Sequence, residues 1–317
     1  MAGIADMATT YNLPNYAGEL MLVTPDDTPF LTAIGGLASQ DPDLVVTATE
    51  FTWQTEDLAA AAQPSIVEGD DPDFEERSRA NLSNLVQIFQ YGLKVSYSKL
   101  AAYSQLASLG NGQVNPVQAE LDHQVQLKLK TAARDVNYSF LRGAYNKPAD
   151  NTTARRTRGL LAAITTNVTA AGAAALTEDM VLDMLQGVYD TRGIRQDMEP
   201  TLIVNSTQKR KLSTIFITNK NYQEATRNVG GVNLQTIETD FGRLNIMLER
   251  AMPQDAVTFA HVRMCRPRFL LIPDKGFLFV EPVAKTGAYE AYQLYGEVGL
   301  EYGDEGSHGK ITGLATS

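Results

Sequence analysis

The sequence contains very little cysteine and histidine for a chain of 317 residues. Cys265 is the single cysteine, so an intramolecular disulfide and a four-thiolate zinc site are both impossible. The three histidines, His123, His261 and His308, lie far apart, and no two have the spacing of a zinc-protease helix. We therefore expect no bound metal and no cofactor.

Long apolar runs are also missing. No segment of the sequence approaches the roughly 20 apolar residues that a membrane-spanning helix needs. The N-terminal segment MAGIADMATTYNLPNYAG lacks the basic start and the apolar stretch of a secretion signal. These absences predict a soluble protein made in a reducing cytoplasm, with no membrane partner.

Positive charge is almost absent from the first quarter of the chain. Residues 1–80 hold 15 acidic residues and two basic ones, a net charge of −13, whereas the remaining residues carry +3. The total of −10 argues against tight nucleic-acid binding, which needs clustered lysine and arginine. The asymmetry suggests an acidic segment that lies on a less acidic surface of a sister subunit. The alternative is a set of solvated acidic loops.

The motifs of common enzymes are missing as well. No G-x-S-x-G sequence is present, and the glycine-rich tail fails as a phosphate loop because Asp304 and Ile311 occupy its glycine and serine/threonine positions. Cys265 lies four residues from His261, about 13 Å on a strand, so a buried, inert thiol is the expected state. The acidic run 68–76 lacks the order of a calcium loop. We expect a protein that is not an enzyme.

The N-terminal half predicts an arm and an extended hairpin. Prolines interrupt every apolar stretch of residues 1–42, which is typical of an extended arm. Residues 43–57 and 81–98 are both strand-like and flank an acidic segment, so we predict one long hairpin. A strand over 81–98 would be roughly 55–60 Å long. Because an isolated hairpin is marginally stable, this one needs a neighbouring subunit to lie on.

The rest of the chain predicts a long helix followed by mixed helices and strands. Asn115-Pro116 is a start signal, apolar residues recur every three or four positions over 116–142, and Gly143 ends the pattern. Further helices are predicted at 177–190, capped by Thr177, and at about 206–215, capped by Ser206. Strands are expected near 201–205, 233–238, 243–249, 257–263, 268–272, 277–281 and 289–302. The fold class is α+β.

Several segments, taken in this order, resemble a known family. They are TPFLTAIG at 28–35, FTWQTED at 51–57, the helix within 115–143, TRGL at 157–160, and the segment 301–309. Together they resemble the major capsid proteins of tailed bacteriophages, with the Hong Kong ninety-seven-type fold, in a short form without a fused scaffolding domain. The resemblance covers nearly the whole chain.

The resemblance implies a division of the chain. Residues 1–42 would be the N-terminal arm, and 43–98 the extended hairpin (E-loop). Residues 99–172 and 282–317 would form the peripheral (P) domain, with 116–142 as its spine helix. Residues 173–281 would form the axial (A) domain.

The resemblance also implies a function. The chain would self-assemble into hexamers and pentamers of an icosahedral shell that encloses the phage double-stranded DNA genome, without sequence-specific DNA contacts. It would lie in the virion after assembly in the host bacterial cytoplasm, with a separate scaffolding protein or none, and with portal and decoration proteins as further partners. An encapsulin-like bacterial nanocompartment shell is the alternative. Some members of the fold crosslink a hairpin lysine to a neighbour, but residues 58–80 hold no lysine and Lys94 is the first in the chain, so we predict no such crosslink.

We also predict where neighbouring subunits meet. Acids of the hairpin would pair with basic residues of a neighbour, while the apolar hairpin face would supply most of the affinity because exposed ion pairs contribute little. The acids are Glu56, Asp57, Glu68, Asp70 and Asp71, and the basic residues are Arg155, Arg156 and Arg158.

Overall fold

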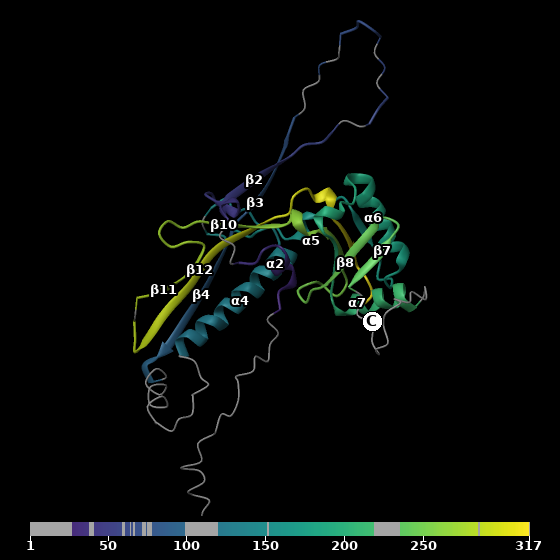
Figure 1. The fold of residues 1–317 in the computed structure, drawn as a ribbon. Helices are drawn as coiled ribbons and strands as arrows, with labels where there is room; N and C mark the ends of the chain where they lie inside the picture. The colour runs from purple at the N-terminus through teal and green to yellow at the C-terminus, as the bar shows by residue number, and fades with distance from the viewer. Residues whose placement is uncertain are drawn as a thin grey trace, which may run out of the picture.

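The computed structural model describes residues 27–37, 41–58, 78–98, 120–150, 152–218, 235–284 and 286–316, with 61–63, 65, 67–71 and 74 between the hairpin strands. Two β-sheets with helices packed on them lie side by side, and a two-stranded hairpin projects away from both (Figure 1). The mixture of helix and sheet confirms the α+β class. No helix in the described part of the chain is long and apolar enough to cross a membrane.

The described helices and short turns are as follows. The helices are α2 (Pro29–Ala33), α4 (Glu120–Arg142), α5 (Leu160–Ala163), α6 (Glu178–Arg192) and α7 (Ser206–Ser213). The turns are η1 (Pro42–Leu44), η2 (Gln196–Met198), the π-helical η3 (Thr214–Thr218), η4 (Val262–Met264) and η5 (Glu305–Ser307). The predicted long helix ends at Arg142 as expected, and its predicted start at residues 115–119 lies outside the described residues.

The first sheet has the long strand β12 (Tyr289–Glu301) at its centre. On one edge β12 pairs antiparallel with β4 (Gln87–Ser96), and on the other with β10 (Arg266–Leu270) and β11 (Leu278–Pro282). The short strand β1 (Val45–Val46) adds parallel to β10. Helix α4 packs on β4 and β12, so that Phe89, Val136, Phe140 and Leu300 share one buried cluster. We call this unit the α4 sheet.

The second sheet has six strands in the order β5-β13-β9-β6-β8-β7. These are β5 (Val168–Ala170), β13 (Gly309–Thr312), β9 (Val257–His261), β6 (Pro200–Val204), β8 (Gly242–Leu248) and β7 (Thr236–Thr239). Helix α6 presents Val181, Leu185 and Val188 to Phe259 and Ile311 of this sheet in a second buried cluster. We call this unit the α6 sheet.

The N-terminal helix α2 is joined to α4 by buried polar contacts. Its Phe30 N–H donates to the Glu249 carboxylate at 3.1 Å, and its Leu31 N–H donates to Asn137 Oδ1 at 2.9 Å. The Asn137 side-chain amide donates in turn to Glu249 at 3.0 Å. Because buried polar groups need partners, this arrangement fixes α2 in place beside α4.

The prediction of one continuous strand over residues 81–98 is wrong. Strand β2 (Glu50–Thr55) pairs only with β3 (Ala80–Leu85), and β4 leaves the hairpin to pair with β12. The change occurs at Val86, which is fully buried, donates its N–H to Thr49 O at 3.0 Å and accepts from Arg155 Nε at 2.8 Å. Thr49 directly precedes β2, so the hairpin ladder ends at Val86, whose carbonyl accepts from Arg155 instead.

The expected cap of α7 is also corrected. Asn205 and not Ser206 is the N-cap, because Asn205 Oδ1 accepts from the N–H groups of Thr207 and Gln208 at 3.0 and 3.1 Å. The cap of α6 is as predicted, with Thr177 Oγ1 accepting from the Met180 N–H at 3.3 Å. Each strand predicted after residue 200 is present, with ends that differ by a few residues.

Candidate subunit-contact site at the hairpin base

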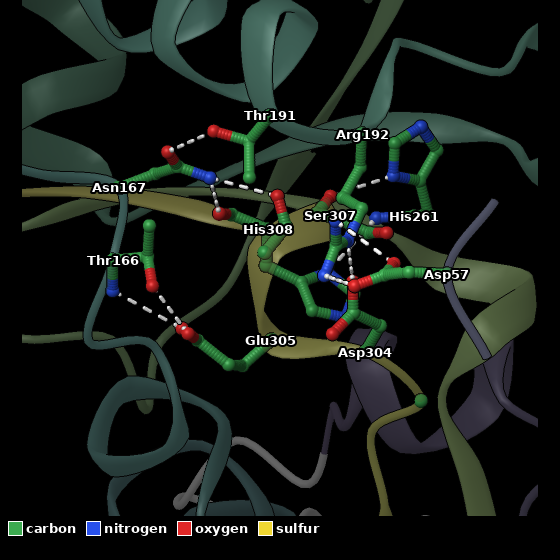
Figure 2. Close-up of polar contacts among 12 residues, drawn as sticks. Asp57, Thr166, Asn167, Thr191, Arg192, His261, Asp304, Glu305, Ser307 and His308 are labelled. Carbon is green, nitrogen blue, oxygen red and sulfur yellow. Dashed lines mark hydrogen bonds and ion pairs between the residues drawn. The ribbon is translucent and has the colours of Figure 1, made fainter. Parts of the chain in front are cut away.

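The turn formed by residues 303–308 connects the hairpin, α6 and both sheets, and we call it the junction turn (Figure 2). It follows β12 of the α4 sheet and leads into β13 of the α6 sheet. Trp53 of the hairpin donates its indole N–H to Gly303 O at 2.8 Å. The chain crosses from one sheet to the other here, so contacts at this turn fix their relative position.

Arg192 joins the hairpin to the junction turn. It lies in the last turn of α6, 3.1 Å from the Asp57 carboxylate at the end of β2, and its Nε also donates to Asp304 (Figure 2). The hydrogen bond to Asp304 raises the pKa of Arg192 above its ordinary value. One guanidinium therefore holds two carboxylates that come from opposite ends of the sequence.

Glu305 and Asn167 tie the turn to the start of β5. Glu305 accepts from the backbone N–H groups of Thr165 and Thr166 at 2.9 and 3.1 Å. Burial favours the neutral form of Glu305, but these donors outweigh it and lower its pKa. The Asn167 amide donates to the carbonyls of Gly306 and His308 at 2.8 and 3.0 Å.

Two buried histidines complete the junction. His261 Nδ1 lies 2.7 Å from Ser307 O, and His261 Nε2 accepts from the Arg195 N–H at 3.0 Å. His308 Nδ1 accepts from the His261 N–H at 3.3 Å, and its Nε2 lies 2.7 Å from Tyr302 O. Burial lowers the pKa of both rings, that of His308 to about 4. Both imidazoles are therefore neutral at pH 7 and serve as structural hydrogen-bonding groups.

A cleft of about 440 Å³ opens beside the junction turn. The hairpin forms one wall through Trp53, and the residues around Arg195 and Met264 form the other. This volume lies in the range of protein binding clefts, about 300–1,000 Å³. Its lining includes four arginines, Arg192, Arg195, Arg263 and Arg266, and four acids, Glu56, Asp57, Glu301 and Asp304. Each of these acids pairs with an arginine of its own chain.

The five acids predicted for subunit contacts divide into two groups. Asp57 pairs with Arg192, and Glu56 lies 3.4 Å from Arg79 on the other hairpin strand. Glu68, Asp70 and Asp71 lie in the projecting loop and are exposed. The structure thus places two acids directly after β2, where the projecting loop begins and which we call the hairpin base, and three farther along that loop.

The three arginines predicted as their partners are clustered near the α4 sheet. Arg155 pairs with Glu297 of β12 in its own chain. Arg158 lies over the Tyr145 ring at 4.3 Å and donates to Tyr302 Oη at 3.2 Å. Arg156 is exposed. Within one subunit the structure does not bring these arginines to the predicted acids, and a pairing between subunits stays a prediction.

Sequence reasoning missed the cleft and the contacts that the junction turn makes. Arg192, Arg195 and Asp304 belong to no sequence motif. The contact between Arg192 and Asp304 joins segments more than 100 residues apart. The only available signal was the position of Arg192 at the end of a predicted helix. Cys265, in contrast, is buried as expected, and burial raises the pKa of its thiol to about 12.

The part of the chain that the structure describes places no metal centre beside these contacts. Within the described ranges, no group of three or more histidine, cysteine, aspartate or glutamate residues is placed to hold a metal ion. The arrangement binds segments of polypeptide to each other through charge and hydrogen bonding.

The fold has solved relatives in viral capsids and encapsulins. The capsid of cyanophage A-1(L) aligns with a TM-score of 0.64 at 12% identity, covering 98% of this chain and 99% of that one. The capsid of a native GTA particle aligns at 0.59 and 15% identity, covering 99% of both chains. The SrpI encapsulin of Synechococcus elongatus aligns at 0.57 and 11% identity, covering 99% of this chain and 96% of that one.

These alignments span the whole architecture and confirm the Hong Kong ninety-seven-type capsid fold. No curated protein matches the sequence. The family model described as "SU10 major capsid protein" matches residues 3–315. The chain therefore belongs to the SU10 major capsid protein family.

Proposed function

We propose that this major capsid protein assembles into pentamers and hexamers that close into an icosahedral shell around a double-stranded DNA genome. The observation that carries the proposal is the projecting loop between β2 and β3 (Figure 1). Its apolar side chains Leu58, Val67 and Phe74 are 92%, 74% and 93% exposed. Large apolar side chains gathered on one projection are typical of an interaction surface.

The energetics favour a second subunit as the partner of this loop. Burying one such side chain contributes about 1.5–3 kcal/mol, whereas an exposed ion pair contributes about 0–1 kcal/mol. Two paired strands alone are marginally stable in water. Contacts of this kind are heterologous, and they form rings because the rotation between neighbours closes. We propose that apolar contact supplies the affinity between subunits and that the hairpin acids orient one subunit on the next. Arg156 is exposed and can pair with such an acid of a neighbour.

We propose the domain division implied by the family, with one adjustment. The α4 sheet would be the core of the P domain, the α6 sheet the core of the A domain, 1–42 the N-terminal arm and 43–98 the E-loop. Strand pairing argues for moving 266–281 into the P domain, because β10 and β11 pair with β12. It likewise argues for moving 168–170 and 309–312 into the A domain.

We propose that the partners of the chain are other copies of itself and, without sequence-specific contact, the packaged DNA. The net charge of −10 supports weak DNA contact, since tight binding needs clustered cations. Portal, decoration and possible scaffolding proteins would join the same shell in the virion, after assembly in the host cytoplasm. We propose no enzymatic activity.

The alternative function is that of an encapsulin-like shell, and the similarity to the SrpI encapsulin supports it. The contents of purified particles separate the two functions. Double-stranded DNA inside supports the capsid, and a protein cargo inside supports the nanocompartment.

The assembly proposal is tested by expressing the chain and imaging it by negative-stain electron microscopy alongside light scattering. We expect closed shells or five- and six-membered rings. The matched variant replaces residues 58–78 with a short Asn-Gly turn, which keeps the strands β2 and β3 but removes the loop. We expect this variant to remain a folded monomer.

Two results would overturn the proposal. One is assembly of the loop-deleted variant as efficient as that of the full chain. The other is a compact full-length monomer whose loop resists protease, because the proposal requires that loop to be exposed until a neighbour arrives.

A further inference from the structure

We infer that the cleft at the hairpin base binds the acidic turn at residues 67–71 of a second copy of this chain. The inference rests on the proposed assembly and names the recognition site within it. It pairs a cleft lined by arginines with a segment that carries three carboxylates.

The cleft has two arginines left over after its internal pairings. Arg192 is held by Asp57 and Asp304, and Arg263 pairs with Glu199. Arg195 and Arg266 also line the cleft and are exposed, and the described residues supply neither with an ion-pair partner. Their guanidinium groups can each bind a carboxylate through two parallel hydrogen bonds.

The cleft also contains apolar surface. Trp53, Met198 and Met264 line it, and each is only partly buried in the single subunit. Methionine side chains are flexible and adapt to an incoming apolar group. The cleft is therefore suited to a ligand with both carboxylates and an apolar side chain.

The turn at residues 67–71 has this combination of groups. The Asp70 N–H donates to Val67 O at 3.1 Å, and Gly69 has φ +89°, so the chain reverses sharply here. Glu68, Asp70 and Asp71 are exposed on it, and the Val67 side chain is 74% exposed. A compact turn that carries three carboxylates and one apolar group complements the arginines and the apolar residues of the cleft.

The occupant comes from another copy because the hairpin points its own turn away. The loop between β2 and β3 projects away from both sheets, and the turn at 67–71 belongs to this loop (Figure 1). The nine residues between Asp57 and the turn can span about 30 Å when extended. A neighbouring subunit can therefore offer its turn where the same subunit cannot.

The test uses assembled shells of a charge-preserving variant. The variant combines Arg195→Lys with Arg266→Lys, which keeps the positive charge of both side chains. Each new lysine also provides an amine, which a zero-length carbodiimide crosslinker couples to a nearby carboxylate. Shells are assembled from equal amounts of unlabelled and heavy-nitrogen-labelled chains. We expect mass spectrometry to find mixed-label peptides that join the new lysines to Glu68, Asp70 or Asp71.

Matched variants serve as controls. Arg243→Lys places an amine on an exposed site of β8 outside the cleft lining, and Arg156→Lys does so at the exposed arginine of the sequence-based hypothesis. Shells that form but give no mixed-label crosslink from the cleft lysines would overturn the inference while leaving the assembly proposal intact. Crosslinks from the Arg156→Lys position instead would overturn it in favour of that hypothesis. Failure of every chain, including the unmodified one, to assemble would overturn both proposals.

Charge reversal gives an independent measurement. We expect Arg195→Glu with Arg266→Glu to lower shell yield about tenfold at low salt, equivalent to about 1.4 kcal/mol. Adding Asp70→Lys and Asp71→Lys to the same chain should restore the yield. A reversed variant that assembles as well as a chain with Arg134→Glu and Arg243→Glu would contradict the inference.

Discussion

Arg192 shows how one side chain can control the position of a projecting element. It holds Asp57, two residues beyond the hairpin strand β2, and Asp304 of the junction turn. The Asp57 side chain is 71% exposed, so this pair contributes little to global stability, on the order of 1 kcal/mol or less. Its effect is local, because it fixes where the hairpin leaves the body.

We expect Arg192→Gln to loosen the hairpin base while leaving the melting temperature nearly unchanged. Hydrogen exchange of the amides in β2 and β3 should become faster, since local opening no longer has to break the ion pairs. Arg263→Gln is the control, because Arg263 pairs with Glu199 away from the hairpin. Equal exchange in the two variants would show that Arg192 does not position the hairpin.

The buried His308 predicts a specific loss of stability in acid. Burial and the neighbouring His261 lower its pKa to about 4, although the hydrogen bond to Tyr302 and the charges of Asp304 and Glu305 oppose the shift. Between about pH 6.5 and pH 4 the unfolded chain binds a proton that the folded chain does not, so stability falls as the pH falls. The shift corresponds to about 3 kcal/mol.

The measurement is the free energy of unfolding of the monomer at pH 7 and at pH 4.5. We expect His308→Gln to be less stable than the unmodified chain at pH 7 but to lose less stability on acidification. His123→Gln, on α4 away from the junction, serves as the control. An identical pH dependence of all three chains would show that His308 is not the titrating group.

At the scale of the element, the end of α4 depends on a close approach of two backbone segments. A Cβ atom on Gly143 would lie 2.3 Å from Ser139 O and 2.7 Å from Thr157 O. The Gly159 N–H also donates to Gly143 O at 2.9 Å. Glycine ends this helix because no larger residue fits between the helix and the segment at 157–159.

We therefore expect Gly143→Ala to lower the free energy of unfolding by about 1–3 kcal/mol, the usual cost of overpacking. Gly92→Ala on β4 is the control, because nothing lies within 4 Å of its added Cβ. Urea unfolding of both variants measures the difference. If both alanines had the same small effect, the close approach at Gly143 would be refuted.

At the scale of the whole molecule, the lysine distribution predicts how assembled shells are held together. Residues 58–80 contain no lysine, and Lys94 is the first lysine of the chain. We therefore predict no lysine–asparagine bond from the loop at 58–80 to a neighbour. We expect shells boiled in detergent to run as a single band of 34.6 kDa on a denaturing gel. A ladder of covalent multimers would contradict this prediction.

The sequence by itself determined the elements with local signals. The end of α4 at Arg142, the Thr177 cap of α6 and the strand pattern of β12 follow from periodicity and capping, which involve neighbours a few residues apart. The order of these elements also carried the resemblance to phage capsid proteins, which the family match over residues 3–315 confirms.

Only the tertiary structure decided which segments meet. The strand pattern of 81–98 is the same whether it pairs with β2 or with β12, and Val86, where the change occurs, is held by Arg155 from elsewhere in the chain. The cleft and the junction turn likewise join α6, the hairpin and the C-terminal segment. Such contacts leave no periodic pattern in the sequence. The number of residues between two contacting partners depends on the fold and not on the local backbone geometry.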